Sequence, residues 1–136
     1  MPDLTPVLAS IAAATGATLG SGTAGATIAQ GDVLYADGTD GGDLKLADDG
    51  ALASSAVVGI ALNAASDGQP IDYIKSGTLT FGAATTSAGA PYFLSTTAGN
   101  LMNTIPASGN FSSFLAVGLS TSTMKVGINN AGVAVP

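Results

Sequence analysis

Few side chains of this chain could take part in chemistry, and they are of few kinds. The 136 residues include nine Asp, three Lys and three Tyr, and they contain no His, Cys, Arg, Glu or Trp. Most general acids and bases, thiolate nucleophiles and nitrogen or sulfur metal ligands are therefore missing. Carboxylates, hydroxyls and three amines remain as the groups on which catalysis or metal binding would depend.

One segment gathers carboxylates closely, Asp37-Gly38-Thr39-Asp40-Gly41-Gly42-Asp43. Its three Asp could offer hard oxygen ligands to Ca²⁺, but the alternating carboxylates and closing Glu of an EF-hand loop are missing. Asp and Gly are also the residues that a tight hairpin turn requires. We therefore expect a turn here, with a cation site as the alternative, and a second turn at Asp48-Asp49-Gly50.

The remaining groups do not predict catalysis. An Asp acid–base pair needs a dry cleft, whereas only Asp72 lies within a predicted strand, and its alternation with apolar neighbours turns it to solvent. A Ser–Lys pair would have to use Lys45, Lys75 or Lys125, and adjacent Lys75 and Ser76 point to opposite faces of a strand. We expect a protein that is not an enzyme and that needs no cofactor or metal.

The negative net charge limits the kinds of partner that this chain could bind. The net charge is −6, the pI is about 4.1, and the three Lys are scattered. They make no basic patch that could neutralise the phosphates of nucleic acid or of an anionic membrane. The N-terminus carries Asp3 and no basic residue before its apolar stretch, and no segment is long and apolar enough to span a membrane. We expect no nucleic-acid or membrane partner and synthesis in the cytoplasm.

From residue 31 onward, short apolar runs alternate with turn signals, and no long stretch has helical periodicity. A shift of 59 residues lays Val33–Tyr35 on Tyr92–Leu94 and Val57–Ile60 on Ala116–Leu119. We predict an all-β domain over residues 31–136, a small β-barrel or sandwich built from two similar half-units.

Two further expectations concern strands and aromatic residues. Ile71–Ile74 and Thr78–Phe81 are expected to be separate strands joined near Ser76-Gly77. The four Phe and three Tyr occupy strand positions, so we expect them to fill the core. Stacking on a carbohydrate is the alternative for the tyrosines, which are Tyr35, Tyr73 and Tyr92.

Residues 1–30 differ from the rest, because they contain one charge and are rich in Ala, Gly and Thr. We interpret them as an extended N-terminal arm and not as core. Its start predicts either a short helix from Thr5 to Gly16 or a strand through Leu4–Leu8. The run Gly20–Gly25 has the composition of a flexible linker.

An ordered series of short motifs runs through the rest of the chain. These are Gly31-Asp32-Val33-Leu34-Tyr35, Leu44–Asp48, Val57–Asn63, Gly68–Ile71, Ser76-Gly77, Tyr92–Gly99, Met124–Asn129 and Gly132–Val135. Their order resembles the capsid decoration, or head cement, proteins of tailed bacteriophages. The resemblance implies a β-rich virion protein on the capsid exterior that forms homotrimers, binds the major capsid protein and reaches neighbouring subunits with an N-terminal arm. It implies no catalytic residue and no cofactor.

The composition of the arm agrees with such a role. An apolar, nearly uncharged segment can thread between subunits and become ordered on binding, with Leu4, Val7, Leu8 and Ile11 as its anchors. Burying four such side chains is worth roughly 6–10 kcal/mol, and ordering the segment costs a similar amount. A role of another class stays open, a trimeric fibre-head or adhesin-type domain that binds a host surface glycan through Tyr and Asp.

Overall fold

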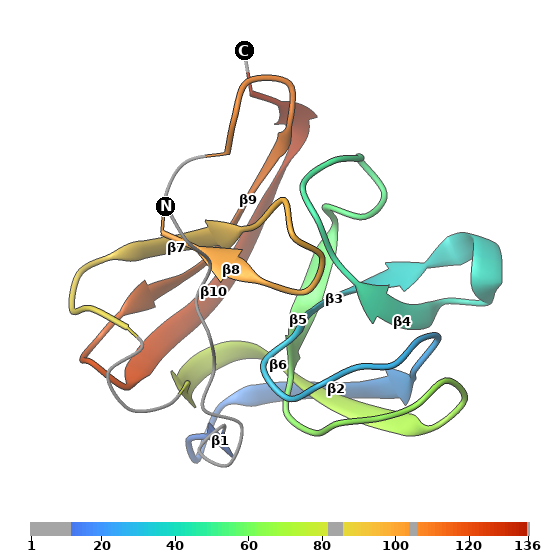
Figure 1. The fold of residues 1–136 in the computed structure, drawn as a ribbon. Coiled ribbons are helices and arrows are strands. Elements are labelled where there is room, and N and C mark those ends of the chain that lie inside the picture. The colour runs from blue at the N-terminus through green and yellow to red at the C-terminus, as the bar shows by residue number, and fades with distance from the viewer. Residues whose placement is uncertain (1–11, 82–85, 104–105, 136) are drawn as a thin grey trace.

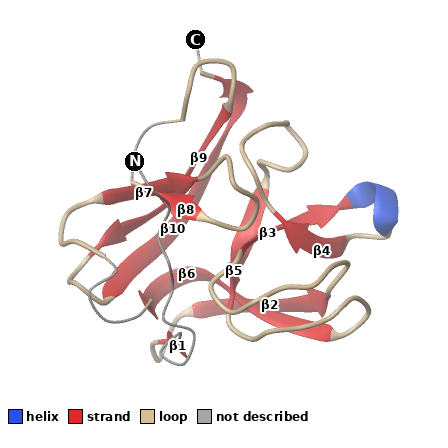
Figure 2. Cartoon of the chain, viewed as in Figure 1, coloured by secondary structure: helices blue, strands red, loops and turns tan. Residues whose placement is uncertain are grey.

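The computed structural model describes residues 12–81, 86–103 and 106–135, which form antiparallel strands curled into a half-barrel (Figure 1). One short 3-10 turn, η2 (Gly38–Asp40), is the blue segment of Figure 2. The all-β fold predicted from the sequence is confirmed. The strands are β1 (Ala12–Ala13), β2 (Thr18–Thr23), β3 (Val33–Asp37), β4 (Asp43–Leu46), β5 (Val57–Ala61), β6 (Pro70–Thr80), β7 (Pro91–Leu94), β8 (Leu101–Met102), β9 (Phe111–Gly118) and β10 (Thr123–Ala134).

The strand order shows the internal repeat. The main path of the sheet runs β4-β3-β5-β6-β10-β9-β7-β8. It is a palindrome once β3 to β6 are matched with β7 to β10, so the two similar half-units predicted from the sequence are present. Figure 1 shows β3 and β4 on one side of the molecule and β7, β8 and β9 on the other. The central pair β6–β10 joins the half-units, with Thr80 opposite Thr123.

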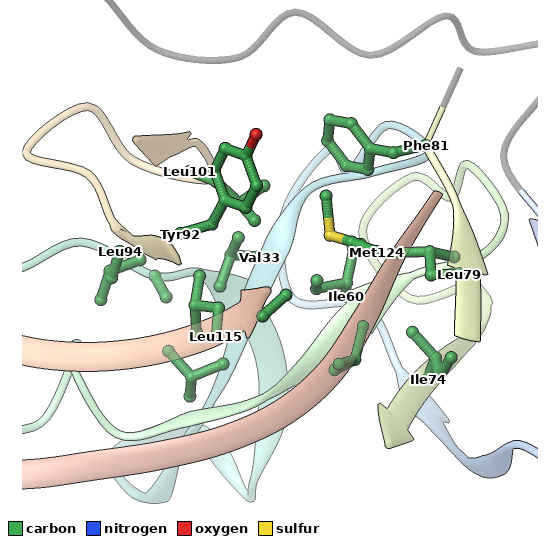
Figure 3. Close-up of a cluster of buried hydrophobic side chains, with 14 residues drawn as sticks. Val33, Ile60, Ile74, Leu79, Phe81, Tyr92, Leu94, Leu101, Leu115 and Met124 are labelled. Atoms are coloured by element: carbon green, nitrogen blue, oxygen red, sulfur yellow. The ribbon is translucent and has the colours of Figure 1, made fainter. Parts of the chain in front are cut away.

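Two hydrophobic clusters fill the interior. The first is shared by the half-units, as Val33, Ile60 and Ile74 lie in it together with residues such as Tyr92 and Leu115 (Figure 3). Successive strand residues point to opposite faces, so the neighbours of these side chains contribute to a second cluster within the first half-unit. That cluster consists of Ala24, Ile28, Leu34, Leu44, Ala61, Ala65 and Ile71.

The segment from residue 12 to residue 30 differs from the sequence expectation. It belongs to the β-structure, because β1 and β2 pair with β6 and because Ala24 and Ile28 are fully buried. The predicted linker at Gly20–Gly25 was wrong, since most of it lies in β2. A Cβ at Gly20 would lie 2.6 Å from the Tyr73 ring, so this glycine serves close packing and not flexibility.

β6 also corrects an expectation. It is one strand of 11 residues, so the predicted turn near Ser76-Gly77 was wrong. Gly77 instead allows the strand to bend, with a φ of 112° and with Ala17 so close that a Cβ would lie 2.8 Å from the Ala17 Cα. β6 pairs with β5 through Tyr73 and Ile74 and with β10 through residues 76–80.

A set of hydrogen bonds, here called the seam, links the half-units beyond this shared strand. The Asn130 side chain bonds both backbone groups of Val57, each at 3.1 Å, and so takes the place of a strand partner. The buried Ser113 hydroxyl donates to the Ser55 carbonyl at 2.6 Å. The Gly99 N–H donates to the Ala47 carbonyl at 2.7 Å. The seam thus joins the two half-units with polar contacts that lie beside the shared apolar cluster.

Candidate interaction surface

The acidic segment Asp37–Asp43 is a turn folded around a lysine. Asp37 Oδ1 accepts hydrogen bonds from the Thr39 N–H and hydroxyl, at 2.9 and 2.6 Å. Lys45 Nζ lies 2.8 Å from Asp37 Oδ2 and 3.2 Å from Asp40 Oδ2. Its hydrogen bond, with those of Thr39, lowers the pKa of Asp37 from 3.8 to about 2. The turn prediction is confirmed, and no group of three or more potential metal ligands was found in the described part of the chain.

The tyrosines lie within strands and not at loop tips. Tyr92 is buried in β7, and its hydroxyl accepts a hydrogen bond from the Ser87 N–H at 2.8 Å. Tyr35 in β3 and Tyr73 in β6 are half-buried and pack against the two clusters. The core position predicted for Tyr92 is therefore confirmed, and Asp72 is exposed beside Tyr73 as expected from the alternation.

The second half-unit carries almost no charge. No charged residue occurs between Lys75 and Lys125, a stretch that includes all of β7, β8 and β9. The carboxylates of the described residues therefore all belong to the first half-unit and its turns, from Asp32 to Asp72. The charge distribution divides the molecule into a charged half and a neutral half, a division that composition alone does not indicate.

An aromatic pair lies on the outer face of this neutral half. Phe93 and Phe114 are cross-strand partners whose rings meet edge to face, 5.8 Å apart at 80°. Phe93 alternates with buried Tyr92 and Leu94 in β7, so it points away from the shared cluster. Met102 is the partner of Phe93 on β8. We call Phe93 and Phe114 the aromatic row.

The aromatic row departs from the sequence expectation that every Phe fills the core. Phe93 and Phe114 are half-buried, whereas Phe81 is fully buried. The hydrophobic character of Phe predicts a buried position for each of them. The pairing register of β7 and β9 is what brings Phe93 and Phe114 together on an outer face. A half-buried aromatic cluster without neighbouring charges is the composition typical of the centre of a protein–protein interface.

β2 provides a second neutral surface. Five of its six residues are exposed and none is charged, and Leu19 keeps 51% of its surface exposed. Among the described residues β2 pairs along one edge with β6, and directly after it Ala24 forms an isolated bridge with Leu44 of β4. An edge strand without charge or proline is a template for another extended chain.

One hollow lies next to the end of β2. It has a volume of about 200 Å³, is open to solvent and has no charged residue in its lining. Its size fits one inserted side chain and not a cofactor. The lining residues are Thr27, Ile28, Ala64, Ala65, Ser66 and Gln69.

The predicted arm anchors Leu4, Val7, Leu8 and Ile11 lie outside the described residues, so their contacts stay a prediction. In the part of the chain that is described, no helix is long and apolar enough to cross a membrane. No family model matches the chain, and no curated protein matches it.

Proposed function

We propose that this chain is a structural virion protein that decorates the outside of a phage capsid and stabilises it by bridging major capsid subunits. The observation that supports this best is the neutral second half-unit with its outward aromatic row. The order of sequence motifs, which resembles capsid decoration proteins, supplies the kind of partner.

The division of charge suits a docking module. With a net charge of −6, the chain would repel a like-charged shell if its carboxylates faced that shell. When the neutral half-unit faces the shell, the carboxylates of the first half-unit stay away from the contact. Half-buried aromatic side chains then become fully buried against the partner, which is how most binding energy arises at protein interfaces.

Homotrimerisation and an N-terminal arm complete the proposal. Residues 12–30 belong to the β-structure, so the segment left to act as an arm is residues 1–11. Its apolar anchors would add contacts to a neighbouring subunit, and many weak contacts on one particle add up through multivalency.

The proposal is tested by mixing the purified chain with undecorated phage heads and measuring occupancy and heat resistance of the particles. The unaltered chain should bind and raise the temperature at which heads open. A failure to bind contradicts the proposal as a whole. Deleting residues 2–11 should weaken binding and leave the circular dichroism spectrum unchanged. Unchanged binding would show that the arm has no part in the proposed function.

A matched pair of variants tests the surface itself. Phe114→Lys places a charge in the aromatic row and should lower the affinity for heads at least about tenfold, through a desolvated charge at the contact. Thr39→Lys places the same charge on the exposed η2 turn of the first half-unit and should bind as the unaltered chain does. Thermal melts check that both variants are folded. Equal affinities of two folded variants would move the contact to another face.

A further inference from the structure

Asp49 lies where the two half-units meet, in the loop between β4 and β5. Asp49 is fully buried. Its backbone N–H donates to the Ser95 carbonyl at 3.2 Å, and its carbonyl accepts from the Phe111 N–H at 2.8 Å. The backbone of this one residue therefore ties the first half-unit to two separate segments of the second, and these two bonds are counted with the seam from here on.

The Asp49 carboxyl group is poorly matched to a negative charge. Oδ2 accepts one long hydrogen bond, from the Thr96 hydroxyl at 3.4 Å, and Oδ1 is buried without a partner among the described residues. Burial raises the pKa of Asp49 above 3.8, and the polar side chains of Thr96 and Asn110 nearby oppose that rise. A buried carboxylate oxygen without a donor is costly, whereas a protonated carboxyl group in the same place is neutral.

The surroundings offer no compensating cation. The segments that face Asp49 from the second half-unit, around Ser95 and Phe111, contain no charged residue. Within its own loop the charged neighbour is Asp48, whose negative charge further raises the pKa of Asp49. Asp48 itself is held by the Gly50 N–H and the Ser54 hydroxyl, at 2.9 and 3.1 Å. Proton uptake from water is thus the simplest way to neutralise the Asp49 site.

We propose that Asp49 is a proton-operated latch between the half-units, closed when its carboxyl group is neutral and loosened when that group ionises. A group whose pKa is higher in the folded than in the unfolded chain binds its proton more tightly when folded. Its stabilising effect is therefore fully present below pH 3.8 and is lost as the pH rises through the folded value. The latch makes the seam tighter in acid and looser near neutral pH.

A second buried carboxyl group, that of Asp32, means that the test must measure the Asp49 contact itself and not only global stability. Burial also raises the pKa of Asp32, whose Oδ2 accepts from the Ala29 N–H at 2.8 Å within the first half-unit. Global stability therefore contains contributions from both carboxyl groups. The amide N–H of Phe111, bonded to the Asp49 carbonyl across the seam, reports on the Asp49 contact more directly than global stability does.

The first experiment measures hydrogen exchange of the full chain between pH 4 and pH 7, corrected for intrinsic exchange. Protection of the Phe111 amide should fall as the pH rises, while protection of the Gly25 amide, bonded to Leu44 away from the seam, should not follow it. Asp49→Asn mimics the neutral acid, so it should make Phe111 protection independent of pH and raise the Tm at pH 7 by about 3–6 °C. Asp67→Asn, at an exposed turn, should change neither.

The second experiment needs no variant. Titration of the carboxyl carbons of the unaltered chain by NMR should give Asp49 a midpoint above 3.8. A midpoint at or below 3.8 overturns the latch, and this measurement decides the matter if Asp49→Asn does not fold. A folded Asp49→Asn variant that keeps the pH dependence of Phe111 protection overturns it as well.

Discussion

Asp37 and Asp49 carry the same side chain in opposite electrostatic surroundings. Asp37 lies at the surface, where Lys45 and two donors of Thr39 favour the ionised form. Asp49 is buried at the seam, where one carboxylate oxygen has no donor among the described residues. The two groups therefore give stability opposite dependences on pH. Asp37 contributes above pH 3.8 and loses its contribution as the pH falls toward 2.

The first prediction concerns the ion pair of Asp37. Lys45→Gln removes the cation that contributes most to the low pKa of Asp37. The midpoint of the Asp37 carboxyl group in an NMR titration should then rise from about 2 toward 3.8. Lys75→Gln, a change at an exposed lysine in β6, is the control and should leave Asp37 unaffected. An unchanged midpoint in Lys45→Gln would assign the low pKa to the Thr39 donors.

At the scale of elements, the repeat preserves a pair of glycines that allow close packing. Gly59 in β5 and Gly118 in β9 match under the shift of 59 residues. A Cβ at Gly59 would collide with the Tyr73 ring and lie 2.6 Å from the Ile74 carbonyl oxygen. A Cβ at Gly118 would collide with the Ser87 carbonyl. In both half-units, glycine lets another segment cross the strand without a gap.

The second prediction follows from this packing. Gly59→Ala and Gly118→Ala should each lower the free energy of unfolding by about 1–3 kcal/mol, because backbone or a packed ring must move. Gly127→Ala in β10 is the matched control, since nothing lies within 4 Å of its added Cβ. Urea denaturation measures all three. A loss in Gly127→Ala as large as in the other two would attribute the effect to the strand backbone and not to the contacts.

The third prediction concerns Asn130, the residue that bridges β10 to β5. Asn130→Ala removes both of these bonds to Val57, whose N–H keeps its hydrogen bond to the Ser55 carbonyl at 3.0 Å and whose carbonyl loses the Asn130 donor. The free energy of unfolding should fall by about 1–3 kcal/mol, the cost of removing a hydrogen-bond donor from a buried carbonyl. Asn129→Ala changes the exposed neighbouring side chain and should have little effect in the same denaturation experiment. Equal stabilities would mean that water replaces the bridge.

Local patterns predict the elements better than they predict burial and register. Alternation and turn residues give most strands, and the repeat gives the two half-units. The glycine-rich sequence of β2 predicts a linker, because its close packing against Tyr73 and Leu44 depends on residues that are distant in the sequence. The sequence predicts correctly that Asp49 lies in a turn. Its burial could not be predicted in this way, because it depends on the distant segments at Ser95 and Phe111. The Phe93–Phe114 pair likewise depends on strand register.

At the scale of the whole molecule, the half-units share one core, so we expect them to fold and unfold together. The first hydrophobic cluster draws Val33, Ile60 and Ile74 from one half and Tyr92 and Leu115 from the other. Separating the halves would expose both sides of this cluster to water, at a cost that grows with the apolar area exposed. Strand β6 also pairs with elements of both halves. The repeat is therefore expected to produce one cooperative unit.

The last prediction tests this cooperativity. Ile60→Ala and Leu115→Ala lie in different half-units but in the same cluster, so each should lower the free energy of unfolding by about 2–5 kcal/mol. Both should shift one transition, seen alike by circular dichroism and by amide exchange in β3 and β9, with an unchanged slope against urea. If Leu115→Ala moved only the transition of β7 to β10, the halves would unfold separately. The neutral surface could then be lost while the charged half stayed folded, whereas a single transition keeps the proposed docking surface intact for as long as any part of the fold persists.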